Sequence, residues 1–160
     1  MSDILIKFDG VQGESTVADH NGWIEISSFS EGLSSPSSAS SGTGSSAGKS
    51  TLHDFNFVAK EGAHTTEIIK QGTGGKHFPK VEIHYLKQTG AGTPEKYRSC
   101  EINEVYITAW TASRAEGSEG FESFSMSGVK AKWEYFKQGP EGGLVSAGSV
   151  TYDQKTATTT

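Results

Sequence analysis

The chain has 160 residues, a formal net charge of −5, a sequence pI near 5.5 and only 33% hydrophobic residues, and its lysines and arginines are scattered. This balance argues against a nucleic-acid-binding surface, and no apolar run approaches the roughly 20 residues that span a bilayer. A single cysteine excludes an internal disulfide framework, and no signal-peptide pattern opens the chain, which is therefore expected to start in the cytoplasm.

Alternating apolar and polar residues predict strands in the first part of the chain, because successive side chains of a strand point to opposite faces. Ile24 and Ile26 share one side of a predicted strand, with Trp23 on the other, and Phe55 and Phe57 share a side of the next. These pairs are candidate core residues. The expected strands are residues 3–8, 23–30 and 52–60.

A break in this alternation over residues 63–71 predicts one short helix, which Thr65 caps and Gly72 ends. After a glycine-rich turn, residues 81–86 alternate again. The polar stretch 88–94 then reverses the chain, which predicts a hairpin with a long tip.

Three further segments complete the expected set of strands. Residues 95–112 alternate with a change of face near Glu104, which predicts a β-bulge. Residues 121–126 and 129–135 follow, separated by a Ser-Gly pair, and a last strand lies near 144–152. With about seven strands, one helix and no strand–helix–strand alternation, the sequence predicts a mainly β fold: an antiparallel β-barrel or sandwich with one short α-helix.

A long Ser/Gly-rich loop is expected over residues 31–51. Its stretch SGTGSSAGKST ends like a phosphate-binding loop, but the required first glycine falls on Thr43, so the spacing argues against a nucleotide site. Such a composition buries too little apolar surface to offset an ordering entropy of about 1–2 kcal/mol per residue. We expect this loop to be mobile until a neighbouring molecule supplies contacts.

The histidines and the cysteine suggest no strong chemistry. Cys100 lies on a predicted strand, where a lone cysteine is usually a small core or surface residue. His77 and His84 are candidate metal ligands, with Asp54 or His53 to complete the set. Isolated histidines of β proteins are more often surface or hydrogen-bonded residues, so no metal is expected.

The carboxylates do not form a recognisable catalytic set either. Glu116, Glu119 and Glu122 lie close in sequence, but such runs at strand ends are usually solvated. We therefore expect no catalytic residue and no cofactor.

Six stretches follow one another in a specific order and spacing: ILIKFDGVQGES at 4–15, AGK at 47–49, LHDFNF at 52–57, GKHFP at 75–79, PEKY at 94–97 and VKAKWEY at 129–135. Together they resemble the haemolysin-coregulated protein (Hcp) family, the tube subunits of bacterial type VI secretion. The resemblance implies a β-barrel with one helix that assembles as a hexameric ring. The rings would stack into a hollow tube, which is propelled from the cell and carries effector proteins in its bore.

The resemblance also implies the domain and its sites. Residues 1–155 would form a single domain, and residues 156–160 a polar tail. The candidate lumen-facing residues are Ser27, Ser28 and Ser30. The candidate contacts between subunits and rings lie in the loop and are Glu31, Leu33, Pro36, Gly48 and Lys49.

The implied partners are further copies of the chain, a contractile sheath, a spike protein and effector proteins, without nucleic acid or membrane insertion. The subunit would leave the cytoplasm through the secretion machinery, without a signal peptide. The alternative is a free-standing ligand-binding or carbohydrate-binding β-sandwich that uses Trp23, Trp110 or Trp133 as stacking platforms.

Overall fold

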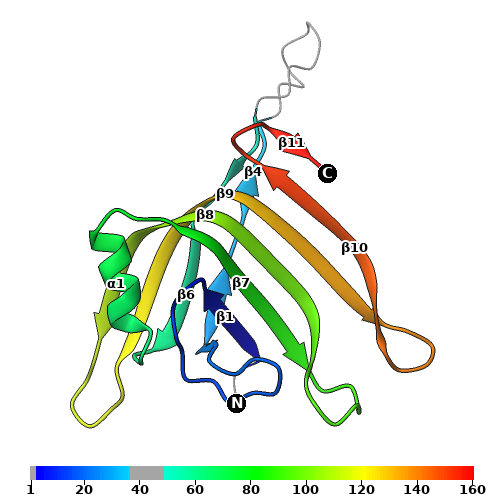
Figure 1. Cartoon of the computed structure of the whole chain (residues 1–160), viewed down its shortest axis with the longest axis horizontal. Coiled ribbons are helices and arrows are strands. Elements are labelled where there is room, and N and C mark those ends of the chain that lie inside the picture. The colour runs from blue at the N-terminus through cyan, green and yellow to red at the C-terminus, as the bar shows by residue number, and fades with distance from the viewer. Residues whose placement is uncertain (1–2, 37–48) are drawn as a thin grey trace, which may run out of the picture.

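The computed structural model describes residues 3–36 and 49–160, and these form eleven strands and one helix (Figure 1). All the strand pairs in this part of the chain are antiparallel, which confirms the predicted mainly β fold with one short helix. The elements are β1 (Ile4–Phe8), β2 (Ile24–Ile26), β3 (Ser28–Ser30), β4 (Leu33–Ser34), β5 (Thr51–Leu52), β6 (Phe55–Lys60), α1 (Thr65–Thr73), β7 (Phe78–Lys87), β8 (Glu95–Ser113), β9 (Phe121–Gln138), β10 (Leu144–Asp153) and β11 (Thr158–Thr159).

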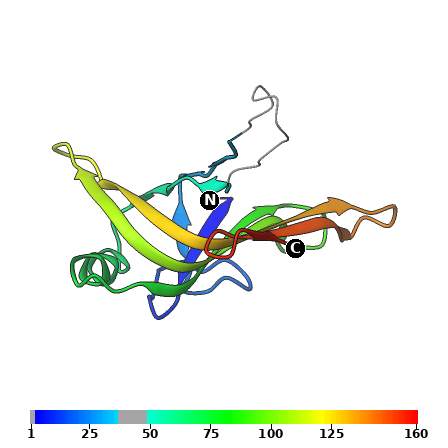
Figure 2. The same cartoon turned by 90° about the horizontal axis from the view of Figure 1, so that it is seen from above.

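The main sheet closes on itself as a barrel. Its strands follow the order β11-β10-β9-β8-β7-β1-β2, and β6 pairs with both β9 and β3. Only Ser27 separates β2 from β3, and its N–H donates to the carbonyl of Val58 in β6 at 2.7 Å. The barrel therefore closes through β2 and β3. The remaining lengths of β8, β9 and β10 extend beyond it in two directions (Figure 2).

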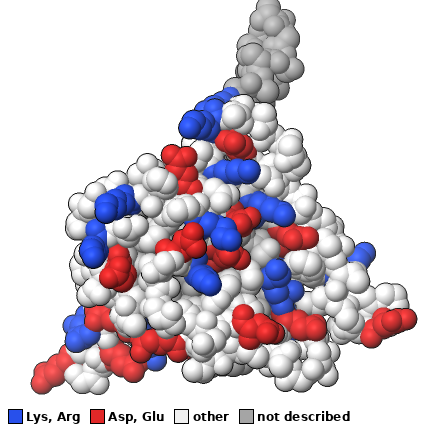
Figure 3. All heavy atoms as spheres, viewed as in Figure 1, with Lys and Arg blue, Asp and Glu red and all other residues white. Residues whose placement is uncertain are grey.

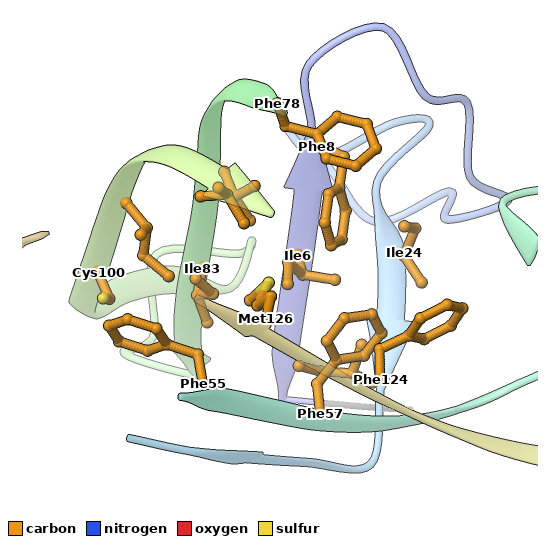
Figure 4. Packing of buried hydrophobic residues seen from close by; sticks show 14 of the residues in the cluster. Ile6, Phe8, Ile24, Phe55, Phe57, Phe78, Ile83, Cys100, Phe124 and Met126 are labelled. Carbon is orange, nitrogen blue, oxygen red and sulfur yellow. The ribbon is translucent and has the colours of Figure 1, made fainter. Parts of the chain in front are cut away.

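Aromatic side chains fill the centre of the barrel (Figure 4). The rings of Phe57 and Phe124 stack with their centroids 5.0 Å apart, and Phe8 meets Phe57 at 5.7 Å. All three side chains are fully buried, and burial of one such side chain contributes about 1.5–3 kcal/mol. This cluster joins β1, β6 and β9 into one core.

The predicted pairs of core residues are confirmed. Ile24 and Ile26 are buried on one face of β2, and Phe55 and Phe57 are buried on one face of β6. Trp23 belongs to a second, smaller cluster on the other face of the sheet, with Leu5, Leu86 and Val17. This cluster fixes the loop between β1 and β2.

Helix α1 begins and ends two residues later than predicted. Thr65 does not cap it; the hydroxyl of Thr65 accepts from the N–H of Gly62 at 3.1 Å and donates to a carboxylate oxygen of Glu122 at 2.8 Å. Gly72 lies inside the helix instead of ending it. A Cβ at this position would come within 3.2 Å of Ile107. The glycine thus lets the helix lie close to β8.

In the described ranges, no helix is long and apolar enough to cross a bilayer.

The change of face in β8 is confirmed, but the bulge predicted at Glu104 is wrong. Ile102 and Val105 are both buried, and β8 keeps the same register with β9 on either side of Glu104. Glu104 has a left-handed backbone with φ of 52°, which exchanges the faces without adding a residue. The register shift lies further along, between Ile107 and Ala109.

The predicted break at Ser127-Gly128 is also wrong, since β9 is one continuous strand of 18 residues. A Cβ at Gly128 would overlap the Cγ2 of Ile102 and lie 3.5 Å from the ring of Phe55. Glycine inside a strand often marks a close approach of this kind. Here it lets β9 pass close over the core.

The two ends of the Ser/Gly-rich loop are paired with each other. Leu33 lies opposite Leu52 in the separate two-stranded sheet of β4 and β5, and the hydroxyl of Tyr152 donates to the carbonyl of Ser50 at 2.7 Å. Residues 37–48 lie outside the described residues, so the mobility of the loop stays a prediction. In the segment expected as a polar tail, β11 pairs with the end of β10.

Charges of both signs alternate on the face seen in Figure 3. Opposite charges meet along β7, β8 and β9: Glu101 lies opposite Lys132, and the Nζ of Lys80 lies 3.1 Å from a carboxylate oxygen of Glu82. The middle of this face therefore carries no single-sign patch, while acidic side chains predominate along its lower edge (Figure 3).

Candidate assembly surfaces

The outer edge of β10 is one candidate surface. Residues 144–150 pair with β9 on one side, and in the described part of the chain β11 reaches only the far end of the strand, at Tyr152 and Asp153. The segment reads LVSAGSV and carries no charge. Natural proteins usually blunt such an edge with charged residues or proline, because it can pair with a strand of another molecule. We call residues 144–150 the wing edge.

The far end of β8 offers a second edge of the same kind. β7 stops pairing with β8 at Val105, and residues 108–113 pair only with β9 among the described strands. This segment reads TAWTAS, is exposed and is also uncharged. We call it the arm edge. The two edges lie on opposite sides of the molecule (Figure 2).

A groove of about 340 Å³ lies beside the wing edge, on the same face as the barrel core. It is lined by Arg98, Tyr135 and Val150, and the last two side chains are 49% and 42% exposed. Arg98 forms an ion pair with Glu31 through one carboxylate oxygen. The other carboxylate oxygen of Glu31 is buried, and the carboxylate also interacts with the buried thiol of Cys100.

Apart from the charged Arg98, the groups beside Glu31 keep their protons and stay neutral. Burial, and then the Glu31 carboxylate, raises the pKa of Tyr85 to about 12. Burial also raises the pKa of the Cys100 thiol, which is fully inaccessible to solvent. Cys100 is therefore a core residue, as predicted, and not a reactive thiol.

The structure places the predicted lumen residues together on one short segment. Ser27, Ser28 and Ser30 are all exposed, with Ser28 and Ser30 at the two ends of β3 and Ser27 directly before it.

The predicted loop contacts are spread along the adjoining segment. Leu33 is 50% exposed, and Pro36 and Lys49 are exposed on either side of the paired β4 and β5. Glu31 lies half-buried against Arg98. Gly48 lies outside the described residues.

The sequence did not predict one buried polar network, which is centred on Glu122. Glu122, expected to be solvated, has a fully buried side chain that accepts from Nε2 of His64 at 2.6 Å, from Thr65 and from Nε1 of Trp110 at 3.2 Å. These bonds tie the start of α1 to β8 and β9. The sequence did contain a hint of this burial. Glu122 lies two residues before the buried Phe124, and therefore on the same face of β9.

His20 and His84 form a second histidine contact, on the outer face of the sheet. Nε2 of His20 lies 2.8 Å from Nδ1 of His84, and both rings pack against Trp23. Burial first, and then Lys96, lowers the pKa of His84 to about 3. The unfolded chain binds a proton near pH 6.5 that the folded chain does not, so acidification from about pH 6.5 toward 3 lowers the stability of the fold.

The suggested metal ligands do not come together. His77 lies against the ring of Tyr106, while His84 contacts His20. Among the described residues, no three histidine, cysteine or acidic side chains are placed to hold a metal ion.

The tryptophans do not favour the carbohydrate-binding alternative. Trp23 is buried under the β1–β2 loop, and Trp133 is half-buried. Trp110 is 42% exposed, but its N–H is bonded to Glu122. Their side chains are thus used by the fold.

Comparison with known proteins identifies the family of the chain and supports its β-barrel fold. A model of the family described as "Type VI secretion system effector, Hcp" matches residues 5–135. Similar solved structures include a type six secretion system protein (24% identity, 100% of both chains, TM-score 0.89), Hcp1 from Salmonella typhimurium (23%, 100% of both chains, 0.80) and a type VI secretion system effector from Yersinia pestis (22%, 94% of this chain and 99% of the other, 0.71). No curated protein matches the chain.

The antiparallel barrel, with one helix and two edges left unpaired among the described strands, defines a mainly β protein. The family match covers most of the sequence, and the structural likenesses establish the same fold. The chain belongs to the Hcp family, the tube proteins of type VI secretion, which confirms the resemblance drawn from the sequence.

Proposed function

We propose that six copies of the chain join head to tail, arm edge to wing edge, and that the resulting rings stack into the hollow inner tube of type VI secretion. The observation that carries this proposal is the pair of free, uncharged edges on opposite sides of one sheet. A head-to-tail contact that closes after a fixed rotation yields a ring and leaves neither edge exposed.

The groove beside the wing edge supports the same joint. Arg98 lines this groove together with the exposed Tyr135 and Val150, and its guanidinium group is paired with Glu31. A charge pair at such a place helps to fix how two surfaces meet, because a wrong partner leaves it unmatched. We therefore assign Glu31 to the contact between subunits.

The exposed residues at the base of the loop are proposed for contacts between stacked rings. Leu33, Pro36 and Lys49 project where β4 and β5 leave the barrel, and Gly48 completes the set. Each contact can be weak, because many act together along a tube and each raises the effective concentration for the next.

The inner face of the ring is proposed to hold passengers. Ser27, Ser28 and Ser30 expose hydroxyl groups instead of apolar or charged ones. Such a surface binds weakly, which suits reversible loading and release of effector proteins. The sheath would surround this tube and a spike protein would cap it. The subunit would start in the cytoplasm and leave with the tube, and its role would be structural and not catalytic.

Replacing Ser30 with tryptophan tests the placement of the bore. We expect intact rings but export of passenger proteins reduced by about fivefold or more, because overpacking a contact costs about 1–3 kcal/mol. Passenger export is measured in culture supernatant against the amount of secreted subunit, with Ser30→Ala as the control. Unchanged export with intact rings would remove Ser30 from the bore.

A further inference from the structure

The returning end of the Ser/Gly-rich loop lies next to the end of β10 (Figure 1). We call the described residues on the two sides of this loop, 31–36 and 49–52, the loop base. Within the loop base, β4 and β5 pair over only two residues each. A two-stranded ribbon is marginally stable at best by itself, and this one is very short. The direction of the loop base therefore depends on contacts with other elements.

Strand β10 supplies the first of these contacts. Tyr152 is buried, and its hydroxyl donates to the carbonyl of Ser50 at 2.7 Å. The side chain of Tyr152 belongs to the core cluster, which fixes the position of the hydroxyl. The carbonyl of Ser50 is thereby tied to a rigid point of the barrel.

The turn that follows β10 supplies the second contact. The N–H of Leu52 donates to Oε1 of Gln154 at 2.5 Å. The backbone N–H of Gln154 donates in turn to the carbonyl of Val129 in β9 at 2.9 Å. The carboxylate of Asp153 accepts from two backbone N–H groups of the same turn. Gln154 is therefore held in place from both sides, and its side chain is a fixed acceptor for β5.

A third contact joins the start of the loop base to β8. Glu31 forms an ion pair with Arg98, which lines the groove beside the wing edge. The loop base is thus bound at its start to β8 and at its end to β10 and the turn after it. Both strands border the groove at which the subunit joint is proposed.

One strand serves both the joint and the loop base. Residues 144–150 of β10 form the wing edge, and Tyr152 lies just beyond them on the same strand. At this end the outer side of β10 is covered by β11, which pairs with Tyr152 and Asp153. Two backbone hydrogen bonds of 2.9 Å between Thr151 and Thr160 complete the pairing. A neighbouring strand along the wing edge would therefore leave β10 paired on both sides from end to end.

We propose that Tyr152 and Gln154 are positioning residues that orient the loop base, so that closing a ring at the wing edge also sets the loops for stacking. The inference rests on the proposed tube assembly and adds an order to it: rings close first and stack second. Neither side chain belongs to the wing edge, so the two residues act on stacking through the loop base and not through the joint itself.

A purely structural role makes a different prediction. If Tyr152 and Gln154 only stabilised the fold, their loss would weaken rings and stacks alike. A positioning role confines the loss to stacking. Gln154 is the sharper probe, because it is half-buried and lies outside the core cluster, whereas Tyr152 also packs in the core.

Sedimentation velocity on the full chain separates single rings from stacks. Gln154→Met keeps the length of the side chain but removes the acceptor. We expect unchanged rings, and stacks that need at least about tenfold more protein, because the same loss is repeated in every copy of the ring. Gln154→Glu keeps an acceptor oxygen and should stack like the unmodified chain. Lys155→Ala, at an exposed position of the same turn, is the matched control and should change nothing.

Hydrogen exchange of the loop base is measured on the same variants and does not require rings. Gln154→Met should speed exchange at the amide of Leu52 by about tenfold or more, because the bond that protects this amide is lost. Gln154→Glu should leave the exchange rate close to that of the unmodified chain.

Three results would overturn the positioning role: stacks of unchanged stability for Gln154→Met, equal losses for Gln154→Met and Gln154→Glu, or loss of rings together with stacks. Unchanged exchange at Leu52 would do the same. An unmodified chain that forms no rings, with faster exchange in Gln154→Met, would instead sink the tube and leave the orientation of the loop base by Gln154 standing.

Discussion

Replacing Val145 and Val150 together with aspartate is expected to turn the assembling subunit into a folded monomer. Both side chains are nearly half exposed on the same face of the wing edge, so the barrel core does not depend on them. In a ring they would be covered by the arm edge of the next copy. Burying an unpaired carboxylate costs several kcal/mol, and each 1.4 kcal/mol is about tenfold in affinity, so each joint should weaken by more than about 100-fold.

Native mass spectrometry, with circular dichroism to verify the fold, measures this outcome. The matched control replaces both valines with threonine, which keeps the shape and the strand preference without adding charge, and rings should persist. If the aspartate variant still forms rings of unchanged stability, the wing edge is not part of the joint.

Replacing Glu122 with alanine should lower the free energy of unfolding by about 3–5 kcal/mol, because it removes the shared acceptor of a buried network. His64, Thr65 and Trp110 would each keep a donor without a partner. Urea denaturation followed by tryptophan fluorescence measures the change. The start of α1 should lose its fixed geometry together with this network.

Glu122→Gln separates loss of the acceptor from loss of volume. Glutamine has a similar size and keeps one acceptor oxygen, so its destabilisation should be clearly smaller than that of alanine. An alanine variant as stable as the unchanged chain would show that the network contributes nothing to stability, and equal losses for both variants would assign the effect to charge alone.

The strands were predictable because their cause is local. Alternation placed Ile24 with Ile26 and Phe55 with Phe57, and each pair lies in the core. The helix was displaced by two residues, since Gly72 was expected to end it. Only the packed structure shows that this glycine faces Ile107, where the helix needs a small residue. The break predicted at Gly128 was wrong for the same reason. A glycine needed for close packing and a glycine needed for a turn cannot be told apart in the sequence.

The candidate surfaces were less predictable than the fold. The sequence indicates a strand over residues 144–152, but whether its outer side is paired depends on the order of strands in the sheet. The burial of Glu122 was not predictable from its neighbours in sequence either. Glu116 and Glu119 are exposed, whereas the hydrogen-bond partners of Glu122 come from the start of α1 and from β8. Long-range contacts of this kind leave only the weak signal of a carboxylate in phase with buried residues.

Light scattering on the purified, unmodified chain over a wide range of concentrations tests head-to-tail assembly most directly. Closed rings predict a particle with the mass of six 17.0 kDa chains, which gives way to stacked multiples as the concentration rises. A single 17.0 kDa particle at every concentration, with both edges still exposed, would contradict it.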